Sequence, residues 1–204
     1  MFWPSFNSAL ASAYDQERAV INTLLSLTAS AVASFAASYY LRGVKKFDMV
    51  DIQNASIAGG VAIGTTSNMM LGPVGAQVIG FLAGWLSVSG YVIIQPFLEK
   101  KLNIYDTCGV HNLHGMPGVL GGLASIVVAG IASVSDYNGI ANYSAVFYNQ
   151  DAGKQAGAQA AFLFITLGIA SVTGVCTGLF SKIVCGGLQP RLYNDDQFFE
   201  KAFR

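Results

Sequence analysis

Both histidines of the chain lie close together, as His111 and His114, in the stretch that runs from Asp106 to Gly118. The ordinary pKa of histidine is near neutrality, so an imidazole inside an apolar helix bundle is expected to be neutral, with one ring nitrogen donating and the other accepting. Such a ring could bind a small polar solute or relay a proton while apolar surroundings exclude hydrated ions. A structural histidine, bonded to a helix backbone or a serine, remains an equally open interpretation.

The spacing of His111 and His114 also suggests a metal site, because residues three apart share one face of a helix. No carboxylate or thiol follows at a spacing that would complete the ligands, so we predict neither a metal nor another cofactor. The three cysteines, Cys108, Cys176 and Cys185, lie in or beside apolar runs, which is typical of buried thiols. A membrane enzyme would need a nucleophile with a base, or metal ligands, inside the membrane. The chain is therefore not expected to be an enzyme.

The elements that must position these histidines are long apolar helices. Of the residues, 53% are hydrophobic and 11% are charged, and the formal net charge of zero gives no indication of nucleic-acid binding. No Asp, Glu, Lys or Arg occurs within residues 19–41, 52–98, 107–135 or 155–181. A helix needs about 20 residues to cross the hydrocarbon, and the second run is about twice that length with a break near Pro73. We predict five spans, near residues 20–41, 54–71, 74–97, 112–134 and 157–182.

The distribution of positive charge predicts the orientation in the membrane. Nine of the eleven lysines and arginines fall on one side of the predicted spans, and only Arg18 and Lys154 fall on the other. Cytoplasmic loops carry the excess of positive charge, so the C-terminus is predicted to be cytoplasmic. The sequon Asn142-Tyr143-Ser144 then lies outside, where Asn142 could be glycosylated. The sequon at Asn54 falls at the cytoplasmic edge and is expected to be unused.

Glycines recur three or four residues apart inside the predicted spans, as at 80–84, 118–122 and 174–178. In lipid, such small residues let helix backbones approach closely. We therefore predict an all-α membrane protein, a polytopic helix bundle with about five transmembrane helices.

Several motifs, in fixed order over nearly the whole chain, carry a resemblance to a known family. Asp-Thr-Cys-Gly at 106–109 and Asn-Leu-His-Gly-Met-Pro-Gly at 112–118 resemble the signature of the Rhesus glycoprotein branch of the ammonium transporter family. Trp-Pro-Ser-Phe-Asn-Ser at 3–8, the segments 47–50 and 52–62, and Met-Met-Leu at 69–71 followed by Pro73 fit the same branch.

The resemblance implies an architecture. Members form homotrimers in which each subunit has a narrow, largely hydrophobic pore between two inverted repeats of five helices, with one further helix. Residues 1–18 then correspond to the end of the sixth helix and an extracellular loop. Residues 19–186 correspond to the seventh through eleventh helices, and residues 187–204 to a cytoplasmic tail. The chain is expected to be the C-terminal half, and the first half lies outside this sequence.

The resemblance also implies roles for individual residues in the pore. His114 matches the second histidine of the pore pair, whose partner on the fifth helix is not in this sequence. Phe6 matches one of the phenylalanines that gate the pore.

Four further residues are placed near the pore. Asp106 matches the acidic residue that opens the histidine-bearing segment, and an acidic residue before a helix is expected to bind its N-terminal N–H groups. Gly115 and Gly118 are expected to be structural, and His111 is expected to lie in a vestibule.

The expected function is an Rh-type channel or transporter for ammonia or ammonium, with carbon dioxide as a further solute to consider. As a truncated half the chain is not expected to conduct alone. The alternative is a non-transporting structural subunit, which loss of the pore histidine would favour, although His114 is present. The expected partners are the lipid bilayer of the plasma membrane and the other subunits of a homotrimer or of a hetero-oligomer with full-length Rh subunits.

Overall fold

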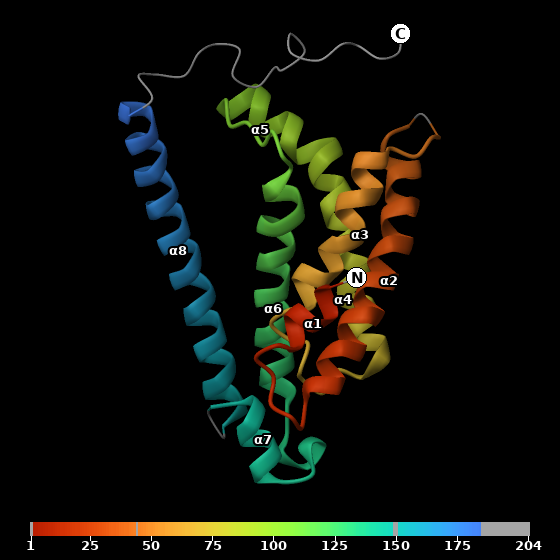
Figure 1. Cartoon of the computed structure of the whole chain (residues 1–204), viewed down its shortest axis with the longest axis vertical. Coiled ribbons are helices and arrows are strands. Elements are labelled where there is room, and N and C mark those ends of the chain that lie inside the picture. Colours follow the sequence, from red (N-terminus) through yellow and green to blue (C-terminus); the bar gives the residue numbers. More distant parts are fainter. Residues whose placement is uncertain (1, 44, 149–150, 185–204) are drawn as a thin grey trace. The chain divides into compact units, whose positions relative to one another are not determined.

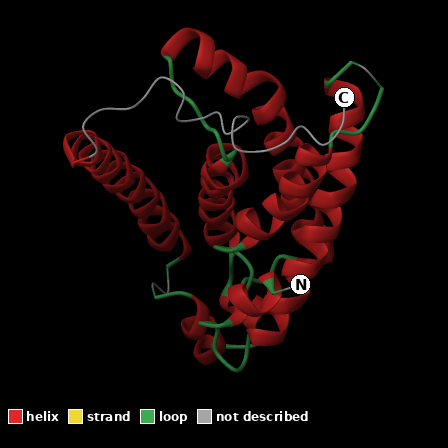
Figure 2. Cartoon of the chain, turned by 45° about the horizontal axis from the view of Figure 1, so that its top comes forward, coloured by secondary structure: helices red, strands yellow, loops and turns green. Residues whose placement is uncertain are grey.

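The computed structural model describes residues 2–43, 45–148 and 151–184, and all the regular secondary structure in that part of the chain is helical (Figures 1 and 2). The chain divides into two compact units, Met1–Leu163 and Phe164–Arg204, which we treat separately. The predicted tail, residues 187–204, and Cys185 lie outside the described residues.

Four helices among the described residues are long and apolar enough to cross a membrane. They are α2 (Gln16–Leu41), the continuous segment Gly72–Leu102, the segment His111–Ile131, and α8 (Ala152–Val184). These four correspond to the predicted spans near 20–41, 74–97, 112–134 and 157–182. The all-α, polytopic helix bundle predicted from the charge-free runs is thus confirmed.

The predicted span 54–71 differs in the structure. Helix α3 covers Met49–Ile63, so it begins and ends earlier than predicted, and at 15 residues it is shorter than a full span. Beyond it the chain turns, and other helices stabilise the turns: Thr65 Oγ1 donates to the carbonyl of Gly121 at 2.7 Å, and Asn22 Nδ2 donates to that of Ser67 at 2.8 Å. Uncharged polar residues end the helix here, and a search for charges alone overlooks them.

Helices α2, α3 and α4 (Gly72–Ser89) pack together through small residues (Figure 1). A Cβ atom at Gly59 would lie 2.6 Å from the Ser26 carbonyl oxygen, and one at Gly84 would lie 2.5 Å from that of Ser30. The same serines form hydrogen bonds between helices, with Ser26 Oγ donating to the Gly59 carbonyl at 2.8 Å. Close backbone approach and hydroxyl hydrogen bonds are how helices associate in lipid, where burial of apolar surface contributes little.

A buried carboxylate joins α2 and α3 at one end of the pair. Asp51 is fully buried, and Arg42 binds it through Nε at 2.6 Å and Nη2 at 2.7 Å. Ser38 Oγ donates a further hydrogen bond to the Asp51 carboxylate at 2.8 Å. The Asp48 side chain caps α3 by accepting hydrogen bonds from the backbone N–H groups of Val50 and Asp51. The side-chain hydrogen bond to Asp51 raises the pKa of Arg42 above its ordinary value, so the guanidinium stays charged.

Two helices contain π turns, and each turn ends two residues before a proline. The turn η1 (Gly90–Ile94) joins α4 to α5 (Gln95–Leu102), and η2 (His111–Gly115) leads into α6 (Met116–Ile131). Proline lacks an N–H and crowds the preceding turn, so the backbone around Pro96 and Pro117 cannot keep regular α-helical bonding. The histidines therefore lie in a widened helical turn.

The segment between α6 and α8 folds around three buried aromatic rings. It contains the short helices η3 (Val134–Tyr137) and α7 (Ile140–Val146). Tyr137, Tyr143 and Phe147 pack at centroid distances of 4.9 to 5.6 Å, and Tyr137 Oη accepts the N–H of Met70 at 2.9 Å. Asn142 lies on α7, half-buried, beside this cluster.

Candidate functional site

Asp106 organises the entry to the histidine-bearing helix. One oxygen of its carboxylate accepts the N–H of Val110 at 2.9 Å and the other accepts that of His111 at 2.9 Å. These are N–H groups without a helical partner, and a carboxylate there also interacts favourably with the helix dipole. Gly109 has a φ of 68°, and a Cβ atom there would collide with the Tyr91 hydroxyl. The capping role predicted for Asp106 is confirmed.

A polar network, not singled out from the sequence, connects the two π turns. The Asn112 side chain is fully buried, and its Nδ2 donates to Gln95 Oε1 at 2.7 Å. Gln95 Nε2 donates in turn to the Asp106 carbonyl at 3.2 Å and to Glu99 Oε1 at 3.0 Å. The network fixes the His111–Gly115 turn against the helix that carries Gln95. The sequence could have indicated this network, because Gln95 and Asn112 are polar residues inside predicted membrane spans.

His114 lies in η2 with its ring on an exposed face. The Trp3 indole stacks on the imidazole, with ring centroids 6.2 Å apart and an interplanar angle of 21°. Among the described residues, no hydrogen bond reaches either ring nitrogen of His114, so neither a backbone carbonyl nor a serine holds it there. The imidazole nitrogens are thus available to a ligand or to another polypeptide.

The short helix α1 (Trp3–Ser8) is fixed in place by Asn7 and Trp3. Asn7 Nδ2 donates to Thr23 Oγ1 at 3.1 Å and to the Gly60 carbonyl at 3.0 Å. The Trp3 ring covers Gly60 so closely that a Cβ atom there would collide with the indole. These contacts position Trp3 between His114 and Phe6, since the Trp3 and Phe6 rings are 6.0 Å apart. Phe6 is 74% exposed and, like His114, has a free face.

Three other residues were expected near the pore. His111 is exposed, and Gly115 leaves room for its ring, because a Cβ atom at Gly115 would lie 2.8 Å from His111 Nδ1. A Cβ atom at Gly118 would meet no described residue within 4 Å, so packing against the described part of the chain does not explain that glycine. The roles given to all these residues in a pore remain predictions.

The chemistry that this arrangement supports is the binding of a small polar solute. A hollow of about 420 Å³ beside α1 is lined by Phe2, Trp3, Phe6, Leu27 and Ile57. Within the described parts of the chain, no group of three His, Cys, Asp or Glu side chains is placed to hold a metal ion. The site is an imidazole beside aromatic and aliphatic surface, which can exchange hydrogen bonds with a solute that has lost its water.

Comparison with solved structures gives two similar folds. The structure of Nitrosomonas europaea Rh50, a protein described with the Rhesus protein family of channels, superposes on this chain with a TM-score of 0.77 at 37% sequence identity. This match covers 100% of this chain and 46% of the other. A structure described as a sensor Amt protein gives a TM-score of 0.66 at 28% identity, covering 89% of this chain and 41% of the other.

Curated relatives agree with the motifs found in the sequence. The chain is 47% identical over 207 residues to the ammonium transporter Rh type B of Danio rerio, a match that covers 99% of this chain and 44% of that protein. It is 45% identical over 208 residues to the ammonium transporter Rh type C of Bos taurus, a match that covers 99% of this chain and 44% of that protein. The chain thus spans less than half the length of the relatives it matches.

The profile of the Ammonium Transporter Family matches residues 1–194, and this agrees with the membrane-spanning helices of the structure. The resemblance drawn from the motifs is confirmed, and the family is one of transporters rather than enzymes. The chain is an integral membrane protein and belongs to the ammonium transporter family.

Proposed function

We propose that this chain is the C-terminal half of an Rh-type channel for ammonia or ammonium, and that His114, Trp3 and Phe6 form one side of the path. The observation that carries the proposal is the exposed imidazole of His114, held by Trp3 and free of hydrogen bonds to the described residues. Relatives named as Rh type B and type C ammonium transporters support the choice of solute.

The physical role of His114 follows from its surroundings. A neutral imidazole can donate one hydrogen bond and accept another, so it can replace part of the water that a small amine loses on entering an apolar path. Hydrated metal ions cannot enter, because neither the aromatic nor the aliphatic side chains replace their water. Only one side of such a path lies in this chain, so we expect that the chain conducts only after further helices cover the face that carries His114 and Phe6.

The experiment measures methylammonium uptake into liposomes. The whole chain is reconstituted alone, and also together with the N-terminal portion of the Danio rerio Rh type B relative supplied as a separate polypeptide. We expect background uptake from the chain alone and saturable uptake from the pair. His114→Ala should reduce the uptake of the pair about tenfold or more, since losing a single buried hydrogen-bonding group costs about 1–3 kcal/mol.

Three outcomes would contradict parts of this proposal. Saturable uptake by the chain alone would show that it does not need a second half. Unchanged uptake by a pair that carries His114→Ala would refute the role of the imidazole. Stable assembly of the pair without any uptake would favour the alternative of a non-transporting structural subunit.

We further propose that the assembled protein is a trimer in the plasma membrane, with the C-terminus in the cytoplasm and Asn142 outside. The excess of positive charge on one side of the spans supports this orientation.

A further inference from the structure

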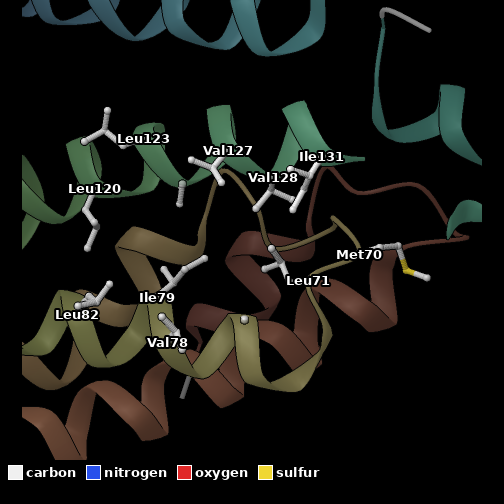
Figure 3. Close-up of a pocket in the computed structure, with 12 residues that line it drawn as sticks. Met70, Leu71, Val78, Ile79, Leu82, Leu120, Leu123, Val127, Val128 and Ile131 are labelled. Atoms are coloured by element: carbon white, nitrogen blue, oxygen red, sulfur yellow. The ribbon is translucent and has the colours of Figure 1, made fainter. Parts of the chain in front are cut away.

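A groove of about 500 Å³ runs between α4 and α6 (Figure 3). Side chains from both helices line it, and the lining is almost entirely aliphatic, including Val78, Ile79 and Leu82 of α4 and Leu123, Val127 and Ile131 of α6. Both walls belong to segments that can cross a membrane, so the groove lies within the depth of the hydrocarbon.

The groove lies on a face of α6 whose side chains are exposed within the first unit, Met1–Leu163. Another face of α6 contacts the first part of α8, where Ser125 Oγ donates to Gln159 Oε1 at 3.4 Å. The groove face is exposed: 62% of Val127 and 50% of Leu123 are accessible. Helices that pack in lipid usually approach over small residues, and this lining consists mostly of branched aliphatic side chains. A flexible hydrocarbon chain fits such a surface better than a second helix does.

A charged hollow adjoins one end of the groove and shares Met70 with it. This hollow of about 430 Å³ is lined by Arg18, Asn22 and Asp136, together with apolar residues. The Arg18 guanidinium donates to the Asn68 carbonyl at 2.8 Å and lies over the Tyr14 and Tyr137 rings, at 5.1 and 5.8 Å.

The two charges of this hollow are each available to a ligand. Both ion pairs formed among the described residues involve Arg42, so Arg18 has no carboxylate of that part of the chain within 4 Å. The Asp136 carboxylate accepts hydrogen bonds from the N–H and the hydroxyl of Ser133, and it remains exposed. A cation and an anion thus stand beside the end of a long apolar groove.

From this geometry we propose that the groove and the hollow together bind one zwitterionic glycerophospholipid. An acyl chain occupies the groove, the phosphate faces Arg18, and the ammonium of the choline or ethanolamine head group faces Asp136. Guanidinium groups bind phosphate oxygens through several parallel donors, and Arg18 has donors left beyond the one that Asn68 uses. The proposal does not depend on whether the chain conducts.

The first test measures phosphatidylcholine binding to the whole purified chain by native mass spectrometry in detergent. Val127→Phe fills the groove, and its matched control is Val32→Phe, because Val32 is an equally exposed valine of α2 outside the groove. We expect that Val127→Phe weakens binding about tenfold, as an overfilled apolar pocket loses its ligand, and that Val32→Phe does not change it.

The second test concerns the head group. Arg18→Gln should weaken phosphatidylcholine binding about tenfold through the loss of a charged hydrogen-bond donor. Arg18→Lys should keep most of the binding, and Lys154→Gln, which removes the other positive charge predicted at this membrane edge, should not change it. Asp136→Asn should remove a preference of the chain for phosphatidylcholine over phosphatidylglycerol, whose head group has no ammonium.

Three results would overturn the proposal. The first is equal binding of phosphatidylcholine to the chain and to Val127→Phe. The second is equal binding of phosphatidylcholine and phosphatidylglycerol to the unmodified chain. The third is a change in oligomer mass with Val127→Phe and no change in lipid binding, which would show that a helix of a second copy occupies the groove. Helical circular dichroism and a single elution peak confirm that each variant is folded before it is measured.

Discussion

The α2–α3–α4 region and the face that carries His114 differ in how many of their side chains have partners within the chain. In the first, serine hydroxyls, glycine contacts and the Arg42–Asp51 ion pair satisfy neighbouring groups within the chain. In the second, Phe6 and the His114 ring remain exposed although Trp3, Asn7 and Asp106 hold them firmly. The difference indicates that the first region provides stability, and the second is the face that we propose to contact a solute or another polypeptide.

The largest effect is expected at the buried ion pair. Arg42→Met leaves the carboxylate of Asp51 buried without its cation, and such a loss costs about 3 kcal/mol or more. Unfolding of the purified chain in mixed micelles, followed by circular dichroism, measures the change. Lys46→Met is the control, since Lys46 is exposed nearby, and it should have little effect. Equal stability of the two variants would mean that the ion pair does not stabilise this region.

A second test compares two glycines, one from each region. Gly80→Ala places a Cβ atom in collision with the Ser26 backbone, so α2 and α4 must separate, at a cost of about 1–3 kcal/mol. Gly118→Ala meets nothing within 4 Å and should be neutral in the isolated chain. Unfolding in mixed micelles, followed by circular dichroism, measures the stability of both variants. A destabilising Gly118→Ala would show that the face carrying His114 is packed rather than open.

A smaller and more local effect is expected at Asp106. Asp106→Ala removes the acceptor of two backbone N–H groups, which should cost about 0.5–2 kcal/mol and speed amide hydrogen exchange at Val110 and His111. Asp151→Ala is the matched control, because Asp151 accepts the N–H of Lys154 at the start of α8. That variant should affect exchange near Lys154 only. Unchanged exchange at His111 in Asp106→Ala would refute the capping role.

The smallest effect on stability is expected at Asn142, which tests orientation. If the α6–α8 segment is outside, the chain expressed in cells that glycosylate should lose a glycosidase-sensitive mobility shift with Asn142→Gln. Asn54→Gln should leave the shift unchanged, because Asn54 is predicted at the cytoplasmic edge. A shift that depends on Asn54 instead would reverse the predicted topology.

The charge-free runs were enough to locate most of the helices, because a charged side chain is costly in the hydrocarbon and marks where a span ends. They misplaced the end of α3, where Thr65 and its neighbours are uncharged yet end the helix by binding other elements. Asp106 was recognised as a cap because capping acts over a few residues and leaves a local pattern.

The amino-acid sequence alone was therefore sufficient for the four long membrane helices, the family and the cap at Asp106, since each depends on local composition or on a contiguous motif. The stacking of Trp3 on His114, the Gln95–Asn112 hydrogen bond and the π turns became visible only in the folded chain. These features join residues far apart in sequence or follow from how whole helices pack, and no local pattern specifies which distant side chain will be the neighbour.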